Sequence, residues 1–319
     1  MPNITGVMGC RPRRRARLGA MPGEDRVLED AAAALDAAMP ALQGWIGRAR
    51  VAEEAIALGA VRRIAATFDL DPWDFVVGSA LPPHWFNLFF ADIAQQSALG
   101  PDGHPRKGEF LPPIPLPRRM GAGRRVRLHG ALRVGDAATK RTEVAAIQPK
   151  AARTGPICVL TMRSSIAARG AVLAVEEFDA IYRAAVAPGA ATVATAPTAP
   201  PAEHAWQEAR PLDPTQVFRY GAITWNAHRI HYDADYARGE EGYPAAVMNG
   251  GLTMHLLLDA ALRHARGRLV GYETRLMRPL FVGDTARFCG SAMAEGRMQA
   301  WVIDTHGAQA AAMTLEFAA

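Results

Sequence analysis

The residues best suited to chemistry lie between Tyr220 and Asp233, in the sequence YGAITWNAHRIHYD, and at Gly250-Gly251, which begins nineteen residues after His231. A histidine with a reference pKa of about 6.5 takes and returns protons at neutral pH. A glycine that opens a helix offers a backbone N–H, with no Cβ in the way, to an oxygen that gains negative charge. The spacing therefore predicts a site where a histidine activates water while a helix N-terminus polarises a carbonyl.

Addition of water to a carbon–carbon double bond beside a thioester needs groups of this kind. The thioester oxygen must accept hydrogen bonds as it becomes negative, the water must lose a proton, and the α-carbon must receive one. His231 is the candidate acid/base, and the N–H of Gly250 is the candidate donor to the thioester oxygen.

The helix that would begin at Gly250 is the clearest element in the chain. From Leu252 to Leu262 apolar residues occur all around the helix axis, which predicts a helix buried on nearly every side. Basic residues follow at 263, 264 and 266, and Gly267 is predicted to end the helix.

The two halves of the chain resemble copies of one unit. The sequence LRVGD at residues 132–136 recurs as LFVGD at residues 280–284, and residues 61–72 can be aligned with residues 217–228. Strand-like alternation follows each turn, at 140–147, 159–166 and 172–178 in the first half and at 286–293, 298–304 and 310–317 in the second. The pattern predicts an α+β double hot-dog fold, two repeats that are each an antiparallel sheet wrapped around a helix.

Composition divides the chain into four parts. Residues 1–43 are predicted to be a disordered or weakly helical extension, 44–184 an N-terminal non-catalytic hot-dog domain, 185–212 an Ala/Pro-rich linker, and 213–319 the catalytic hot-dog domain. The first domain is predicted to be non-catalytic because Asp74 stands where the repeat would need a histidine. One active site is therefore expected.

Charge and hydropathy exclude several classes of function. Five arginines within residues 11–17 account for the whole net charge of +5, so no basic stripe for nucleic acid is left on the folded part. No apolar run approaches the roughly 20 residues of a membrane span. Cys10, Cys158 and Cys289 are widely spaced, which favours a reducing cytoplasm and excludes a thiolate metal site. His228 and His231 could form a metal pair with Asp233, but no third ligand motif is evident, so no metal is expected.

The segment from Trp225 to Asp233 resembles the signature of the MaoC-like (R)-specific enoyl-CoA hydratases. Asn226 stands at the family's aspartate, His228 at its asparagine and His231 at its histidine, while residues 249–252 stand at the opening of the central helix. The sequence of this segment is most similar to that of one subgroup, the mesaconyl-C4-CoA and itaconyl-CoA hydratases and the mitochondrial type 2 hydroxyacyl-thioester dehydratases. The resemblance covers about residues 44–319.

The resemblance implies a lyase that reversibly hydrates a short-chain enoyl-CoA, with dicarboxylic acyl groups such as mesaconyl-C4-CoA among the candidates. It implies no cofactor beyond the CoA of the substrate. Since an amide cannot take a proton, Asn226 is expected to hold the water and leave more of the proton transfer to His231. Substrate contacts are expected from Arg118, Arg119, Tyr232, Asn249 and Gly251, the two arginines meeting CoA phosphates, and support is expected from His228, Arg229 and Asp233.

Two other functions stay open at this point. Hot-dog domains also host acyl-CoA thioesterases, and the loss of the aspartate is consistent with a module that only binds acyl thioesters. The sequence leaves open CoA or a carrier protein as the acyl carrier, and it allows a homodimer. The aromatic residues 85, 86, 89 and 90 are expected in the core rather than on a ligand wall.

Overall fold

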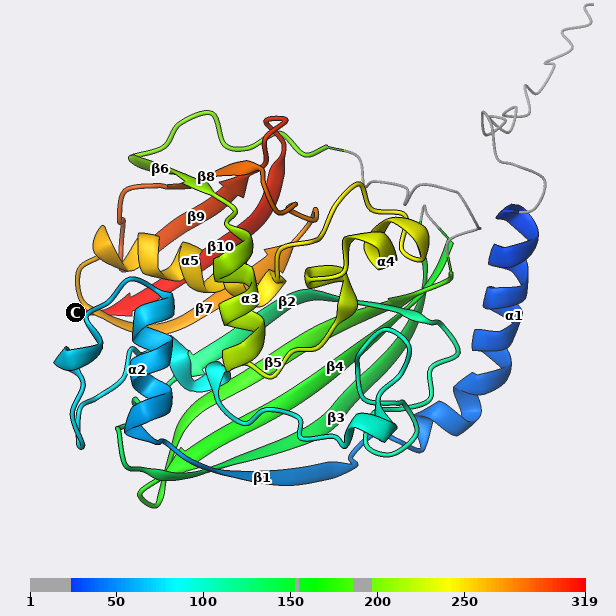
Figure 1. Ribbon diagram of the computed structural model, residues 1–319, viewed down its shortest axis with the longest axis horizontal. Helices are drawn as coiled ribbons and strands as arrows, with labels where there is room; N and C mark the ends of the chain where they lie inside the picture. Colours follow the sequence, from blue (N-terminus) through cyan, green and yellow to red (C-terminus); the bar gives the residue numbers. More distant parts are fainter. Residues whose placement is uncertain (1–23, 153–154, 186–196) are drawn as a thin grey trace, which may run out of the picture.

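The computed structural model describes residues 24–152, 155–185 and 197–319, which form one ten-stranded antiparallel sheet with helices against one face (Figure 1). The strand order is β1-β3-β4-β5-β2-β7-β10-β9-β8-β6. The first five strands are β1 (Ala49–Ala55), β2 (Arg118–Leu128), β3 (Ala137–Ala152), β4 (Gly155–Ala168) and β5 (Ala171–Arg183). The others are β6 (Trp206–Pro211), β7 (Arg268–Leu276), β8 (Thr285–Gly290), β9 (Arg297–Ile303) and β10 (Gln309–Ala318).

The sheet consists of two copies of one five-stranded pattern. The order β1-β3-β4-β5-β2 in the first half corresponds to β6-β8-β9-β10-β7 in the second, and the halves join where β2 pairs with β7, from Gly123 opposite Arg275 to Arg127 opposite Gly271. All six strand segments predicted from alternation fall within or overlap β3, β4, β5, β8, β9 and β10. The predicted duplication and the double hot-dog fold are confirmed.

The repeated turn shows the duplication at the level of single hydrogen bonds. Gly135 and Gly283 have φ of 97° and 95°, the left-handed region that favours glycine. The N–H of Gly135 donates to Ile56, at the end of β1, and the N–H of Gly283 donates to Leu212, at the end of β6. Equivalent glycines thus hold equivalent strands.

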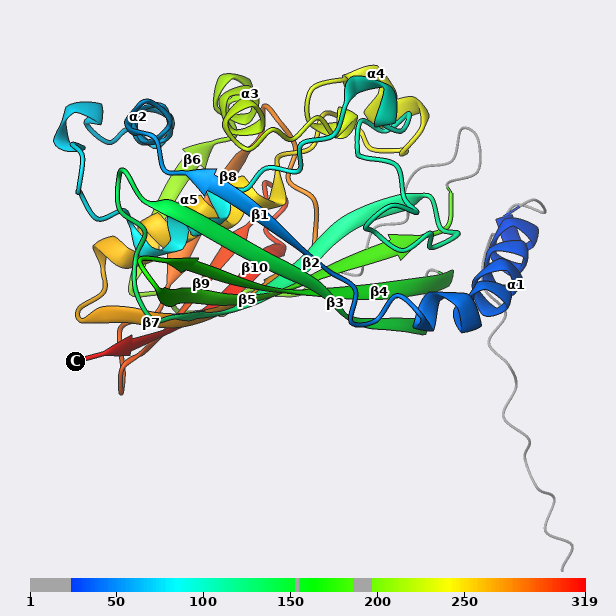
Figure 2. The ribbon, with the colours of Figure 1, turned by 90° about the horizontal axis from the view of Figure 1, so that it is seen from below.

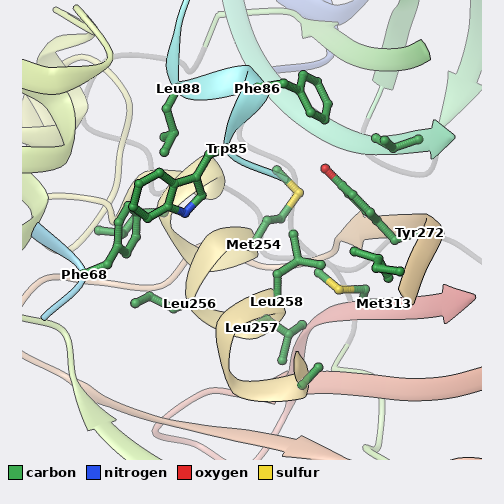
Figure 3. Packing of buried hydrophobic residues seen from close by; sticks show 14 of the residues in the cluster. Phe68, Trp85, Phe86, Leu88, Met254, Leu256, Leu257, Leu258, Tyr272 and Met313 are labelled. Atoms are coloured by element: carbon green, nitrogen blue, oxygen red, sulfur yellow. The ribbon is translucent and has the colours of Figure 1, made fainter. Parts of the chain in front are cut away.

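Helix α5 (Gly250–Arg263) is the central helix of the second half, as predicted. Its residues from Leu252 to Leu258 are all buried, and they pack against the aromatic residues around Trp85 and against strands behind (Figure 3). The helix ends at Arg263, with His264 as the C-cap, so the prediction that it runs to Gly267 is wrong. Gly267 instead lies directly before β7, with φ of 84°, and a Cβ there would meet the carbonyl oxygen of Ala318 at 2.4 Å.

The first half has no α-helix at the corresponding place. Helix α2 (Leu58–Thr67) matches α3 (Pro214–Ile223), and both lie on the same side of the molecule (Figure 2). Residues 68–117, however, contain only the short 3-10 helices η1 (Pro72–Asp74), η2 (Pro83–Leu88) and η3 (Gln96–Ala98). The expectation that each sheet wraps a helix therefore holds only for the second half. Trp85 and Phe86 of η2 are buried in the core, as predicted.

Two parts of the predicted domain division need correction. Strand β6 lies inside the predicted linker 185–212 and pairs along its whole length with β8, so the second unit begins by Trp206. Helix α1 (Glu24–Gln43) lies in the extension predicted to be disordered or weakly helical, but it packs Leu35 and Leu42 into a core with β3 and β4. The arginine-rich segment 11–17 and residues 186–196 lie outside the described residues.

No helix in the described part of the chain combines the length and the apolar character that a membrane crossing requires.

Candidate active site

A cavity of about 1020 Å³ lies between the two halves and is lined by residues of both. From the second half come His231, Asn226 and the start of α5, and from the first half come the loop at His104 and the strands β2 and β3. Every residue predicted to catalyse or to bind substrate lines this cavity, namely Asn226, His231, Gly250, Arg118, Arg119, Tyr232, Asn249 and Gly251.

The N-terminus of α5 presents free donors to the cavity. Neither Gly250 nor Gly251 donates its N–H to any described residue, as expected for the first turn of a helix. A Cβ at Gly250 would lie 2.5 Å from Cδ1 of Leu276, and one at Gly251 would lie 2.3 Å from the hydroxyl oxygen of Tyr220. A larger residue at either position would displace Leu276 or Tyr220, and the helix dipole makes this point favourable for negative charge.

Asn249 precedes these glycines as the N-cap of α5, but its side chain makes no capping hydrogen bond. Its amide nitrogen and oxygen are both buried and neither has a hydrogen-bond partner among the described residues. Buried polar atoms without partners are rare and need an explanation, such as a water or a ligand atom. This amide lines the cavity beside the free N–H of Gly250.

His231 lies on the short helix η4 (Arg229–His231), and its ring is fixed by one hydrogen bond. Nδ1 lies 2.7 Å from the carbonyl oxygen of Val247. A carbonyl only accepts, so Nδ1 carries the proton and Nε2 is left as the basic nitrogen. Burial lowers the pKa of His231 to about 4, although the Val247 carbonyl opposes this shift, so the ring is a neutral base at pH 7.

Asn226 forms hydrogen bonds within its own loop through its side-chain oxygen and its backbone N–H. Its Oδ1 accepts the N–H of His228 at 3.0 Å, and its backbone N–H donates to Gly221 at 2.8 Å. The oxygen of the amide therefore stabilises the turn, and the Nδ2 group is left to donate. An Asn226 that holds water would do so by donating to the oxygen of that water.

His228 is 5% exposed and its ring contacts two other imidazoles. The ring centroids of His228 and His231 are 5.4 Å apart with the planes nearly perpendicular, and those of His228 and His104 are 4.1 Å apart. Burial, and the charges that His104 and His231 can carry, lower the pKa of His228 to about 2. His228 therefore packs against both rings as a neutral imidazole at pH 7.

Asp102 and His104 are the residues that sequence analysis missed. Nδ1 of His104 lies 3.0 Å from Oδ2 of Asp102, and the backbone N–H of His104 donates to Oδ1 at 3.0 Å. Burial opposes ionisation of Asp102, but the hydrogen bonds and the charge of His104 outweigh it and lower the pKa to about 2. The structure therefore contains an aspartate–histidine pair, contributed by the first half.

Close backbone contact holds this pair against the catalytic loop. Gly103 has φ of 86°, and a Cβ there would lie 1.9 Å from the carbonyl oxygen of Ala227. The N–H of Arg229 donates to the carbonyl oxygen of Asp102 at 2.9 Å. More than 120 residues separate the two segments in the chain, and the only sequence signal was a glycine between an acid and a histidine.

The same residues change the argument about a metal. Ligand atoms of Asp102, His104 and His228 all lie within 4.8 Å of one another, so a third ligand does exist for His228. The metal group rejected from the sequence was a different one, His228 and His231 with Asp233. In the structure both oxygens of Asp102 accept hydrogen bonds from His104, so this carboxylate is already paired with the imidazole.

Arg229 and Asp233, which the sequence analysis expected to support the site, form hydrogen bonds within the loop and to its neighbours. Nη2 of Arg229 donates to Oδ2 of Asp233 at 2.6 Å, and Nη1 donates to the carbonyl oxygen of Pro101 at 3.1 Å. Oδ1 of Asp233 accepts the N–H of Tyr236 and caps helix α4 (Ala234–Gly239). Asp233 thus holds a guanidinium and a helix end, and its hydrogen bonds go to no imidazole among the described residues.

The two arginines predicted to meet CoA phosphates differ in their surroundings. Arg118 donates through Nε to Oε2 of Glu241 at 2.5 Å and through Nη2 to the carbonyl oxygen of the same residue at 3.2 Å. The side chains of Arg118 and Glu241 are only 11% and 10% exposed. Arg118 is therefore neutralised within the protein, which makes Arg119 the better candidate for a phosphate.

Comparison with known sequences assigns the chain to a family. Residues 84–282 match the model of the family described as hydroxyacyl-thioester dehydratase type 2. The chain is 41% identical over 238 residues to the mesaconyl-C(4)-CoA hydratase of Chloroflexus aurantiacus, which covers 74% of this chain and 84% of that protein. It is 37% identical over 79 residues, 24% of this chain and 26% of the relative, to the mitochondrial hydroxyacyl-thioester dehydratase type 2 of Schizosaccharomyces pombe.

Solved structures share the fold at low sequence identity. A MaoC-like dehydratase aligns with a TM-score of 0.64 and 16% identity over 87% of this chain and all of the other. A conserved Mycobacterium tuberculosis protein described as having a double hotdog fold aligns with a TM-score of 0.54 and 17% identity, over 85% of this chain and 96% of the other. The family model covers most of the folded chain, and the chain therefore belongs to the hydroxyacyl-thioester dehydratase type 2 family.

Proposed function

We propose that the protein is a lyase that reversibly adds water to the double bond of a short-chain enoyl-CoA thioester. The observation that carries the proposal is the fixed tautomer of His231, whose basic nitrogen is left free in the cavity that also receives the unpartnered N–H of Gly250. A general base and an oxyanion donor in one cavity are the two requirements of the reaction.

The proposed step begins with water held by the Nδ2 group of Asn226. Nε2 of His231 takes a proton from this water while its oxygen bonds to the β-carbon of the thioester. The electron pair of the double bond moves toward the thioester carbonyl, whose oxygen becomes negative and accepts the N–H of Gly250. Protonation of the α-carbon completes the 3-hydroxyacyl thioester, and dehydration follows the same steps in reverse.

The proton for the α-carbon comes, in our proposal, from His104. The family's aspartate is replaced by Asn226, which has no proton to give, and Asp102–His104 is a carboxylate–imidazole pair whose imidazole lines the same cavity and packs against His228. The ionised Asp102 fixes the proton on Nδ1 of His104 and stabilises the imidazolium. After one turnover His231 holds a proton and His104 lacks one, and exchange with water restores both.

The named relative supports a short acyl group, since the Chloroflexus aurantiacus protein is a mesaconyl-C(4)-CoA hydratase. We propose CoA as the carrier and Arg119 as a phosphate contact. The chemistry requires no redox cofactor or metal. A cytoplasmic location and a homodimer remain predictions. The described domain boundaries lead us to place the catalytic unit at residues 206–319, with the first half as its cover.

Replacement of His231 tests its role as the base. His231→Gln should lower kcat for hydration of crotonyl-CoA by about 10²- to 10⁴-fold, because glutamine keeps a hydrogen bond to Val247 but cannot take a proton. The rate is measured by loss of the absorbance of the enoyl thioester, with the exposed His204→Gln as the matched control. Full activity in His231→Gln refutes the assignment, and release of free CoA from a saturated acyl-CoA without hydration identifies a thioesterase instead.

The pH profile tests the environment of the same ring. His231 is active when neutral, and burial lowers its pKa to about 4, so activity is retained as the pH falls and is lost only through about pH 4. The kcat/KM of the wild type should therefore have an acid limb near 4, measured in buffers of constant ionic strength over the range in which the protein stays folded. A limb at about 6.5, the value of an exposed histidine, contradicts the described burial.

The role of His104 is tested by an effect that a structural residue would not produce. His104→Ala should lower kcat by at least about 10-fold with little change in KM, and added imidazole should restore part of the rate, because it can fill the vacated space and supply the proton. Asp102→Asn should also lower kcat. An equal fall in kcat that imidazole does not restore shows that His104 only shapes the loop.

A further inference from the structure

One end of the cavity, over the sheet of the first half, carries charges that the hydration step does not use. Arg124 on β2 and Lys140 on β3 line it, and Glu176 on β5 lies beside them, 3% exposed. Arg124 forms an ion pair with Glu176 through Nη1, and its guanidinium lies over the ring of Phe178, 5.0 Å from the centroid. Because the described first half has no α-helix between residues 68 and 117, this part of the sheet lines the cavity.

Lys140 has no partner of its own in this group. Among the residues that the structure describes, its ammonium forms no hydrogen bond and no ion pair, while Glu176 is taken by Arg124 and Asp92 is taken by Arg50 at 2.9 Å. Burial lowers the pKa of Lys140, Arg124 and Arg50 lower it further, and Glu176 and Asp92 oppose the shift. One positive charge on a half-buried side chain is therefore left without a counter-ion among the described residues, in the lining of the cavity.

A second atom in the same place also lacks a partner. Nε of Arg124 is buried and has no hydrogen bond to a described residue. Among the residues that line this part of the cavity, a buried donor of Arg124 thus lacks a hydrogen bond, and the ammonium of Lys140 lacks a counter-ion among the described residues. An anion with more than one acceptor oxygen would satisfy both.

The part of the cavity lined by Arg124 and Lys140 is placed to contact the acyl group of the substrate rather than its CoA. The charge of Arg124 acts on Tyr220, and the hydroxyl of Tyr220 is the atom that a Cβ at Gly251 would meet. The charged end therefore lies close behind the start of α5, where the thioester oxygen is placed. Phe89, Phe90 and Phe178 line the wall around it, which suits an acyl group better than a phosphate.

We propose that Lys140, with Arg124, binds a carboxylate at the far end of the acyl group, so that the preferred substrate is a short dicarboxylic enoyl thioester. This assignment rests on the proposed hydratase function and adds the subsite that selects among its substrates. A bound carboxylate makes the cluster of Arg124, Lys140 and Glu176 neutral. An acyl group with a methyl at that position leaves Lys140 unpaired.

The test replaces Lys140 by methionine, which keeps the length of the side chain and removes the charge, and compares mesaconyl-C4-CoA with crotonyl-CoA. The ratio of the two kcat/KM values should fall by about 10- to 100-fold in Lys140→Met, because only the dicarboxylic substrate loses a charge-assisted contact. Lys150→Met is the matched control, since Lys150 is exposed on the same strand and does not line the cavity. It should leave the ratio unchanged.

Binding separates this proposal from the proposed reaction. Calorimetry should show that the wild type binds mesaconyl-C4-CoA more tightly than crotonyl-CoA and that Lys140→Met removes the difference, even if neither ester is hydrated. Turnover of crotonyl-CoA with no preference for the dicarboxylic ester overturns the subsite and leaves the hydratase function standing. An equal loss for both esters in Lys140→Met also overturns it.

Thermal unfolding shows whether the variant is folded. Removal of a half-buried charge that has no counter-ion should leave the Tm of Lys140→Met, without ligand, equal to or above that of the wild type. A clear fall in Tm would assign Lys140 a structural role and overturn the proposal. If methionine does not fold, Lys140→Gln serves for the same comparison of the two esters.

Discussion

The hydrogen bond between Nδ1 of His231 and the carbonyl oxygen of Val247 is the contact on which the site depends. It sets the tautomer of the imidazole, so the basic nitrogen is the one left free. It also ties the catalytic loop to the residues just before α5, since Val247 precedes Gly250 by only three positions. The distance between base and oxyanion donor is therefore set by a short piece of backbone that a buried helix holds in place.

Duplication followed by divergence gave the two halves different parts of one site. The second half kept the central helix, which supplies the free N–H groups and the positive end of a dipole. The first half has 3-10 helices and loops at the corresponding place, which leave room for a cavity over β2 and β3. The loop at Asp102–His104 then reaches the catalytic loop of the other half, where Gly103 allows the two backbones to touch.

Much of this architecture follows from local sequence patterns. Alternation predicted the strands because one face of each is buried, and the all-round apolar stretch predicted α5 because that helix is enclosed. The repeated LRVGD and LFVGD sequences predicted the duplication. The glycine recurs in both because each turn has a positive φ at that position. The three residues placed in catalysis, His231, Asn226 and Gly250, do line one cavity, since their spacing is local to one half.

The parts that could not be predicted depend on contacts between distant segments. Pro82 and Pro83 stand at the start of η2, which is a 3-10 helix. The comparison of the two repeats predicted a helix like α5 in the first half and did not predict this difference. Strand β6 is short and polar, and only its pairing with β8 reveals it. No sequence motif marks Asp102, His104 or Lys140. Their proposed roles follow only from the residues that the fold brings next to them from distant parts of the chain.

The most direct test of the central claim is a crystal structure with butyryl-CoA, a saturated ester that cannot be hydrated. The account predicts the thioester oxygen about 2.7–3.1 Å from the backbone nitrogen of Gly250, and the β-carbon facing Nε2 of His231 across a space for one water. A thioester oxygen bound elsewhere in the cavity, or a β-carbon on the side of the acyl group away from His231, would contradict it.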